Sequence, residues 1–254
     1  MPDRVSFQLY SARNSPLAAT LKMVAGIGYR DVEGYGGVYD DPLALRAGLD
    51  ANGLAMPTGH FDLEMLETGR PKVLAIAATL GISHIYAPYL AEAQRPKTAA
   101  GWTKFGKRLA AVGEWLRSEG YGFGWHNHDF EFARLPNGAL PLDLIFAAAP
   151  LLDWEIDVAW VVRAAQNPLS WIKTHAGRIT SVHVKDIAPA GHCLDEDGWA
   201  DVGTGTVNWG RCFAALKKTR AMHLIVEHDN PNDLARFARR SFGAVKGAGQ
   251  PDDR

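Results

Sequence analysis

Ionisable side chains stand at the ends of several apolar segments of the sequence. Glu155 and Asp157 alternate with apolar residues in one segment, His183 and Lys185 alternate with valines in another, and Glu227 ends a third. In a β-strand, residues two apart share a face, so each pair is predicted to point in one direction. Such groups are costly at a buried strand end unless they are paired, hydrated or metal-bound. Each alone fits a hydrogen-bonded rim group, but together they indicate a site.

These residue types offer a mixed nitrogen and oxygen ligand set. Asp157, His183 and Glu227, with a fourth ligand from residues 125–128, would bind one divalent metal ion. Imidazole and carboxylate ligands suit Mn²⁺, Mg²⁺, Zn²⁺ or Co²⁺, and the sequence does not choose among these ions. The two cysteines show no Cys-x-x-Cys spacing, which excludes a cysteine-based zinc site.

Eight short apolar segments must position these residues. They are predicted as strands over residues 5–10, 31–36, 55–61, 84–90, 122–128, 154–160, 180–186 and 222–228. Amphipathic stretches lie between them, and Asp41-Pro42, Asn167-Pro168 and Asn230-Pro231 are typical helix starts. Repeated strand–helix alternation predicts a parallel sheet of the α/β class.

Eight strand–helix units in 254 residues are typical of a closed (β/α)8 TIM barrel. The rival fold, an open doubly wound sheet, normally places a glycine-rich phosphate loop after its first strand. Here Tyr10-Ser-Ala-Arg-Asn follows instead, and the first glycine is Gly26. No low-complexity linker divides the chain, so a single barrel domain over residues 1–254 is predicted, with its site at the carboxyl ends of the strands.

Composition excludes several classes of partner. Hydrophobic residues make up 47% of the chain and charged residues 22%, as in a globular protein with a sizeable core. The formal charge of −1 lacks the basic excess of a nucleic-acid-binding protein. No apolar run has the length of a membrane span, and no secretory signal is visible. The sequence therefore indicates a cytoplasmic protein with neither a nucleic-acid nor a membrane partner.

Five motifs carry a resemblance to a known family. They are Trp125-His-Asn-His-Asp-Phe-Glu-Phe132, Glu155-Ile-Asp-Val-Ala-Trp160, Gly177-Arg-Ile-Thr-Ser-Val-His-Val-Lys-Asp186, Val202-Gly-Thr-Gly-Thr-Val-Asn-Trp209 and Ile225-Val-Glu-His-Asp229. On these motifs the sequence resembles the xylose-isomerase-like superfamily of sugar-phosphate isomerases and epimerases. The resemblance covers essentially the whole chain and implies one divalent ion held by Glu, Asp, His and Glu from strands five to eight.

The first of these four ligand positions departs from the family pattern. Relatives often carry Glu-Asn-His there, whereas this chain reads His126-Asn127-His128. His126 thus takes the place of the first carboxylate, and Glu131 is the alternative source of a carboxylate. Asp157, His183 and Glu227 match the other three metal positions.

The chemistry implied by the resemblance is proton transfer next to a carbonyl through an enediolate. This would isomerise or epimerise a sugar, a sugar phosphate or a keto-sugar. Glu227 is expected to act as a base, and the candidates for the second acid–base group are His128, His60 and Glu33. Lys185 is expected to contact a substrate oxygen, unless it forms a salt bridge to Asp157 or Glu155. The candidates for substrate binding are His60, Glu33, Trp160 and Glu131.

Three alternatives remain open. One is a keto-sugar dehydratase or lyase of the inosose-dehydratase type, and another is a non-catalytic sugar-binding relative. An endonuclease IV-like enzyme is disfavoured, because Trp160 and Asp197-Gly-Trp199 stand where relatives place further zinc ligands. Barrels of this kind often pair, so a homodimer is compatible with the resemblance.

Overall fold

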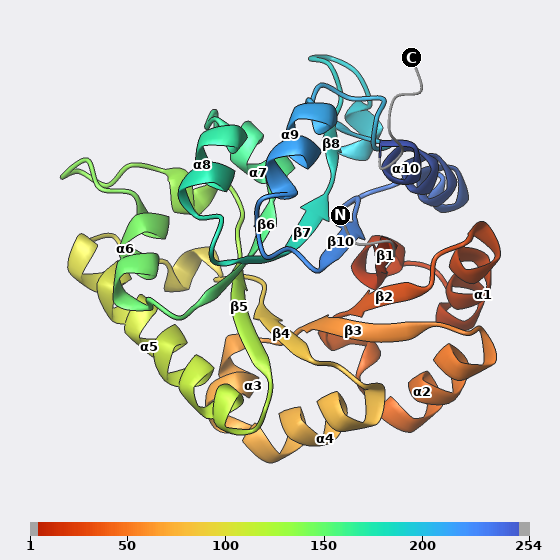
Figure 1. Ribbon diagram of the computed structural model, residues 1–254, viewed down its shortest axis with the longest axis horizontal. Coiled ribbons are helices and arrows are strands. Elements are labelled where there is room, and N and C mark those ends of the chain that lie inside the picture. The colour runs from red at the N-terminus through yellow and green to blue at the C-terminus, as the bar shows by residue number, and fades with distance from the viewer. Residues whose placement is uncertain (1–4, 249–254) are drawn as a thin grey trace.

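Eight parallel strands form the centre of the computed structural model, which describes residues 5–248 (Figure 1). The barrel strands are β1 (Val5–Gln8), β2 (Asp31–Gly34), β3 (Ala55–His60), β4 (His84–Ala87), β5 (Gly122–His126), β6 (Asp153–Asp157), β7 (Ile179–Val184) and β10 (His223–Val226). They close in the order β1-β10-β7-β6-β5-β4-β3-β2. The predicted single (β/α)8 barrel is confirmed; residues 1–4 and 249–254 of the predicted domain lie outside the described residues.

Helices surround the barrel on its outside (Figure 1). They are α1 (Leu17–Ile27), α2 (Pro42–Ala51), α3 (Leu63–Thr68), α4 (Arg70–Leu80), α5 (Ala99–Ser118), α6 (Pro141–Ala148), α7 (Val158–Arg163), α8 (Pro168–Thr174), α9 (Trp209–Leu216) and α10 (Leu234–Ala248). Short 3-10 turns are η1 (Leu9–Ala12), η2 (Gly36–Val38), η3 (Glu92–Gln94), η4 (Phe130–Phe132) and η5 (Leu194–Glu196). A small antiparallel pair, β8 (Asp186–Ile187) with β9 (Trp199–Ala200), lies in the long loop after β7.

Two predicted helix starts are confirmed and one is wrong. Asp41 and Asn167 accept hydrogen bonds from backbone N–H groups at the starts of α2 and α8. The Asn230-Pro231 pair does not begin a helix. Asp233 takes that role, since its carboxylate accepts from the backbone N–H of Arg236 in the first turn of α10.

Most of the predicted strands extend too far at their carboxyl ends. The Gln8 side chain accepts a hydrogen bond from the backbone N–H of Tyr10, which turns the chain into η1. Asp157 caps α7 by accepting from the backbone N–H of Trp160 at 2.9 Å, so Trp160 lies in a helix and not in the predicted strand. Capping residues at strand ends start new turns before the apolar pattern ends.

Strand β7 illustrates how the barrel separates apolar from ionisable residues. Val182 and Val184 belong to the hydrophobic core that the helices cover. Ser181, His183 and Lys185 lie on the other face of the chain and are equally buried. The period of two along a strand therefore directs the ionisable side chains to the barrel interior.

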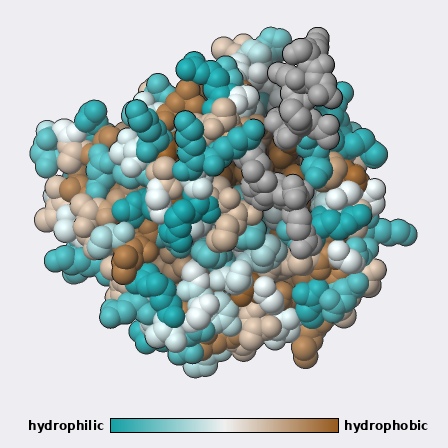
Figure 2. Space-filling view, in the orientation of Figure 1, coloured by the Kyte–Doolittle hydropathy of each residue, from teal (hydrophilic) through white to brown (hydrophobic). Residues whose placement is uncertain are grey.

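The outer surface is mixed in character. On the face shown in Figure 2, hydrophilic side chains are interspersed with small hydrophobic groups. Among residues 5–248, no helix combines the length and apolar character needed to cross a bilayer.

Candidate functional site

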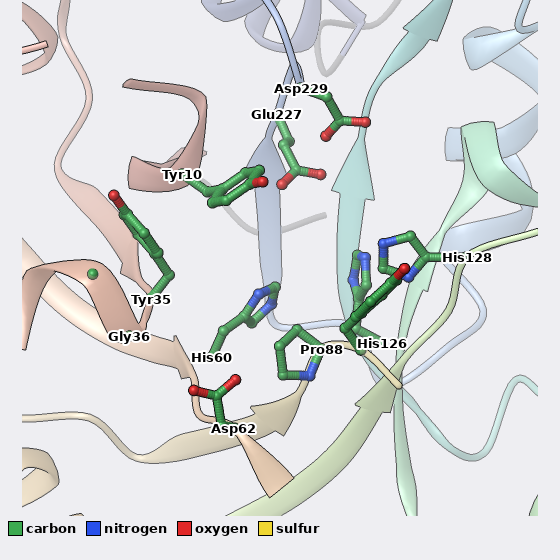
Figure 3. Close-up of a pocket in the computed structure, with 12 residues that line it drawn as sticks. Tyr10, Tyr35, Gly36, His60, Asp62, Pro88, His126, His128, Glu227 and Asp229 are labelled. Atoms are coloured by element: carbon green, nitrogen blue, oxygen red, sulfur yellow. The ribbon is translucent and has the colours of Figure 1, made fainter. Parts of the chain in front are cut away.

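A pocket of about 670 Å³ opens at the carboxyl ends of the barrel strands. Its lining consists of Tyr10, Tyr35, Gly36, Gly37, His60, Asp62, Pro88, Tyr89, His126, His128, Glu227 and Asp229. Figure 3 shows the tyrosines Tyr10 and Tyr35 on one side and His126 and His128 on the other. This volume is in the range of small-molecule sites.

The structure brings the four predicted metal ligands together. Ligand atoms of His126, Asp157, His183 and Glu227 all lie within 4.8 Å of one another, and the four residues are buried. We call this set the upper cluster. Strand register explains the convergence, because Asp157 pairs with His183 across β6 and β7 and Glu227 follows β10 directly. A divalent ion fits this set, since one Asp157 oxygen, Oδ2, has no hydrogen-bond partner.

Asn127 holds the Asp157 backbone in place. Its side-chain oxygen accepts from the backbone N–H of Asp157 at 3.0 Å and from the Trp154 indole N–H at 2.9 Å. The other Asp157 oxygen, Oδ1, is used to cap α7. Asp157 is therefore fixed with Oδ2 directed at its neighbours in the cluster.

Lys185 lies among the carboxylates beside the upper cluster. Its Nζ is 2.7 Å from Asp229 Oδ1, 3.0 Å from Glu227 Oε2 and 3.6 Å from Asp157 Oδ2. Burial lowers the pKa of Lys185, but these carboxylates outweigh burial and raise it. Burial likewise raises the pKa of Glu227, but Lys185 and His183 outweigh it and hold that pKa well below its usual value. Glu227 is thus ionised, and Lys185 is a permanent cation that does not line the pocket.

His128 and Glu131 are linked through the backbone. Glu131 is fully buried, and its oxygens accept from the Trp125 indole N–H at 2.8 Å and the His128 backbone N–H at 2.9 Å. Burial raises the pKa of Glu131 to about 8. Burial, with Lys185 nearby, lowers the pKa of His128 to about 3, so its imidazole is neutral at pH 7. Glu131 positions His128 and lies outside the upper cluster.

A second layer of ionisable groups joins His60, which lines the pocket, to Glu33 and Glu155, which are fully buried. His60 Nε2 is 2.5 Å from Glu155 Oε2 and 3.2 Å from Glu33 Oε1. Glu33 Oε1 also lies 2.7 Å from His183 Nε2 and accepts from Gln8 at 2.8 Å. Burial lowers the pKa of His60, but the charges of Glu33 and Glu155 outweigh it and raise it to about 10.

The predicted substrate-binding residues separate into two groups. His60 lines the pocket, whereas Glu33 and Glu131 are fully buried beneath it. Trp160 also lies outside the lining, and its ring is 5.2 Å from that of His128 and 4.8 Å from that of Trp199. In this structure, Trp160 packs behind His128.

One ionisable residue of the site, Asp229, was not predicted, and Glu155 was placed on the ligand face without a role as a ligand. Asp229 lines the pocket and binds Lys185, and Glu155 occupies the second layer at 0% exposure. The signal for both is spacing, since each lies two residues from a predicted ligand, Glu227 or Asp157. The two-residue period of β6 places Glu155 on the ligand face, whereas Asp229 lies beyond the end of β10.

The barrel and its convergent acids and imidazoles define an α/β-barrel protein with a candidate metal centre at the carboxyl ends of its strands. The family model for the xylose isomerase-like TIM barrel matches residues 21–245. The chain belongs to this family. No curated protein matches the chain.

Several solved structures share the fold. A sugar phosphate isomerase/epimerase from Parabacteroides distasonis is 20% identical with a TM-score of 0.82, over 98% of this chain and 95% of that one. The probable 3-DHS dehydratase AsbF from Bacillus anthracis is 12% identical with a TM-score of 0.73, over 95% and 98% of the two chains. The IolI protein, whose structure holds a zinc atom, is 15% identical with a TM-score of 0.73, over 96% and 97%.

Proposed function

We propose that this protein is a divalent-metal-dependent sugar isomerase or epimerase. The observation that carries the proposal is the upper cluster, with four ligand atoms within 4.8 Å beside a pocket lined by Glu227, His128 and tyrosines. The similarity of fold to a sugar phosphate isomerase/epimerase supports the same class of reaction. A zinc atom in the IolI structure supports the choice of a divalent ion.

His126, Asp157, His183 and Glu227 would hold the ion. The ion would polarise a substrate carbonyl and stabilise the negative charge that develops when a neighbouring carbon loses a proton. Burial and the carboxylates of Glu155 and Glu227 act in opposite directions on His183, and the carboxylates raise its pKa well above the usual value. Because the nitrogen that binds a metal must be deprotonated, His183 would give up this proton to hold the ion.

The proton-transfer groups line the same pocket. Glu227 is ionised because Lys185 stabilises its charge, so it can accept a proton from a carbon next to the carbonyl. His128 has a neutral imidazole on another wall of the pocket (Figure 3), where it can carry a proton to or from a substrate oxygen or carbon. Tyr10 and Tyr35, edge to face at 5.3 Å, offer aromatic surface to the apolar face of a sugar.

Solvent proton exchange tests the proposal. Aldoses, ketoses, their phosphates and keto-sugars are incubated with Mn²⁺-loaded protein in D₂O, and deuterium incorporation is followed by NMR. Glu227→Gln should abolish exchange and keep the circular dichroism of the parent, whereas Glu119→Gln, at an exposed position, should exchange at the parental rate. Exchange at the parental rate in Glu227→Gln would refute the assignment of the base.

A keto-sugar dehydratase is the second candidate, and the similarity of fold to a probable dehydratase favours it. Elimination also begins with removal of a proton next to a carbonyl, so Glu227 keeps its role. The two reactions differ in product, because dehydration yields an unsaturated carbonyl compound that absorbs in the ultraviolet. A non-catalytic sugar-binding protein would show neither exchange nor absorbance, and would bind sugar equally well after Asp157→Ala.

A further inference from the structure

A second group of potential metal ligands lies below the upper cluster. Ligand atoms of His60, His126, Glu155 and His183 also lie within 4.8 Å of one another, and all four residues are buried. We call this set the deep cluster. It shares His126 and His183 with the upper cluster but replaces Asp157 and Glu227 by His60 and Glu155. Because His126 pairs with Glu155 across β5 and β6, these two residues occupy the same level of the barrel.

Two carboxylate oxygens of this layer have no hydrogen-bond partner. They are Glu155 Oε1 and Glu33 Oε2, and both side chains are 0% exposed. Buried polar atoms without partners are rare and costly in folded proteins. A cation in the deep cluster would give these atoms a partner that the described side chains do not supply.

The carboxylates around the two clusters outnumber the lysine charge beside them. Five buried or pocket-lining carboxylates, those of Glu33, Glu155, Asp157, Glu227 and Asp229, lie around the two clusters. Lys185 is the one fully buried cationic side chain of residues 5–248 apart from histidines. Four negative charges then remain for metal ions, or for protons on His60 and His183, to compensate.

His183 connects the two layers. Its Nδ1 is 2.9 Å from Glu227 Oε2 of the upper cluster, and its Nε2 is 2.7 Å from Glu33 Oε1 and 3.3 Å from Glu155 Oε2. The two ring nitrogens therefore face different carboxylate groups. After loss of both ring protons, this imidazolate can bind a metal ion on each side.

We propose that the deep cluster binds a second divalent metal ion, held by His60, Glu155, His126 and His183 with Glu33 beside it. Three imidazoles and a carboxylate form a nitrogen-rich set that suits Zn²⁺ better than Mg²⁺. This ion is additional to the one in the upper cluster, on which the proposed function rests.

Zinc counting tests the second site. The full chain is stripped with chelator, dialysed against Zn²⁺, freed of loose metal by gel filtration and analysed for zinc per chain. The parent and the surface control Glu119→Gln should retain two equivalents. Glu155→Gln, which alters the deep cluster alone, should retain one, and Asp157→Asn, which alters the upper cluster alone, should also retain one. Circular dichroism checks that each variant is folded.

His60→Gln provides a second test of the deep cluster if Glu155→Gln does not fold. A parent with one equivalent that Glu155→Gln and His60→Gln both retain would overturn the proposal, because protons on His60 and His183 would then compensate the deep carboxylates. If the deep variants lose zinc and Asp157→Asn does not, the second site stands and the upper cluster of the proposed function fails. The two proposals are therefore refuted by different variants.

Discussion

Lys185→Met tests whether the site depends on an internal cation. The lysine side chain is 0% exposed, and its Nζ contacts Asp229 at 2.7 Å and Glu227 at 3.0 Å. Methionine has a similar length and an apolar stem but no charge. The substitution therefore leaves two carboxylates, and Asp157 at 3.6 Å, without their cation.

The cost follows from the burial of the pair. Removing one partner of a buried ion pair destabilises a protein by about 3–5 kcal/mol, because the other charge remains in a medium of low polarity. For a chain of this size each kcal/mol corresponds to about 2–4 °C, so the metal-free variant should melt about 6–20 °C below the parent. Added Mn²⁺ should raise the melting temperature of the variant more than that of the parent, because the ion no longer meets the lysine charge.

Urea and thermal unfolding of chelator-treated protein, repeated with Mn²⁺, measure both effects. Lys107→Met is the matched control, since Lys107 is exposed on α5 and its loss should change stability by less than about 0.5 kcal/mol. Equal free energies of unfolding for metal-free Lys185→Met and parent would refute the reasoning, as would a loss of stability that Mn²⁺ leaves unchanged.

Three further predictions concern pH, backbone packing and metal removal. Burial and the charge of Arg178 lower the pKa of His175 from 6.5 to about 4. As the pH falls, the unfolded chain binds this proton before the folded chain does. The free energy of unfolding is therefore full above pH 6.5 and falls by about 1–2 kcal/mol, allowing for solvent screening, as the pH drops to 4. His175→Phe should reduce this loss in urea titrations, and an unchanged pH profile would contradict the role of His175. Gly205→Ala would place a Cβ atom 2.2 Å from Asp186 Oδ1 and should lower the free energy of unfolding by about 1–3 kcal/mol. In the control Gly210→Ala the nearest atom lies at 3.8 Å, so stability should not change. Equal melting temperatures for Gly205→Ala and the parent would exclude the clash. Returning Mn²⁺ to chelated protein at 100 times its Kd should stabilise the fold by about 2.7 kcal/mol per site, and no shift would mean that the folded chain does not bind this ion.

The barrel could be predicted from the sequence because strand patterns are local. Alternation over a few residues determines both the strand and its buried face, as in residues 181–185, and parallel closure brings all carboxyl ends to one rim. The prediction of strand ends was less accurate, because the Gln8 and Asp157 side chains bind the backbone beyond them. Those hydrogen bonds depend on side-chain conformations that a hydrophobic pattern does not determine.

The depth of each site residue could not be predicted, because it depends on the register between strands. Glu33 pairs with Thr58 after a shift between β2 and β3. His60 therefore lies two residues nearer the rim than Glu33 and lines the pocket, whereas Glu33 lies below it. Both residues lie near the carboxyl ends of predicted strands, so both were equal candidates for substrate binding.

The register between β5 and β6 also bears on His126, where the chain departs from the family pattern. The resemblance implies a carboxylate at this position, and the chain has an imidazole there. Glu155 lies directly opposite His126 on β6, with its Oε2 3.2 Å from His126 Nδ1, so a carboxylate is present at the same level on the adjacent strand. The same Glu155 oxygen lies 2.5 Å from His60 Nε2, so one carboxylate contacts both imidazoles. His126 and Glu155 together therefore offer a nitrogen and an oxygen atom at this level of the barrel, and an imidazole at position 126 does not leave the level without a carboxylate.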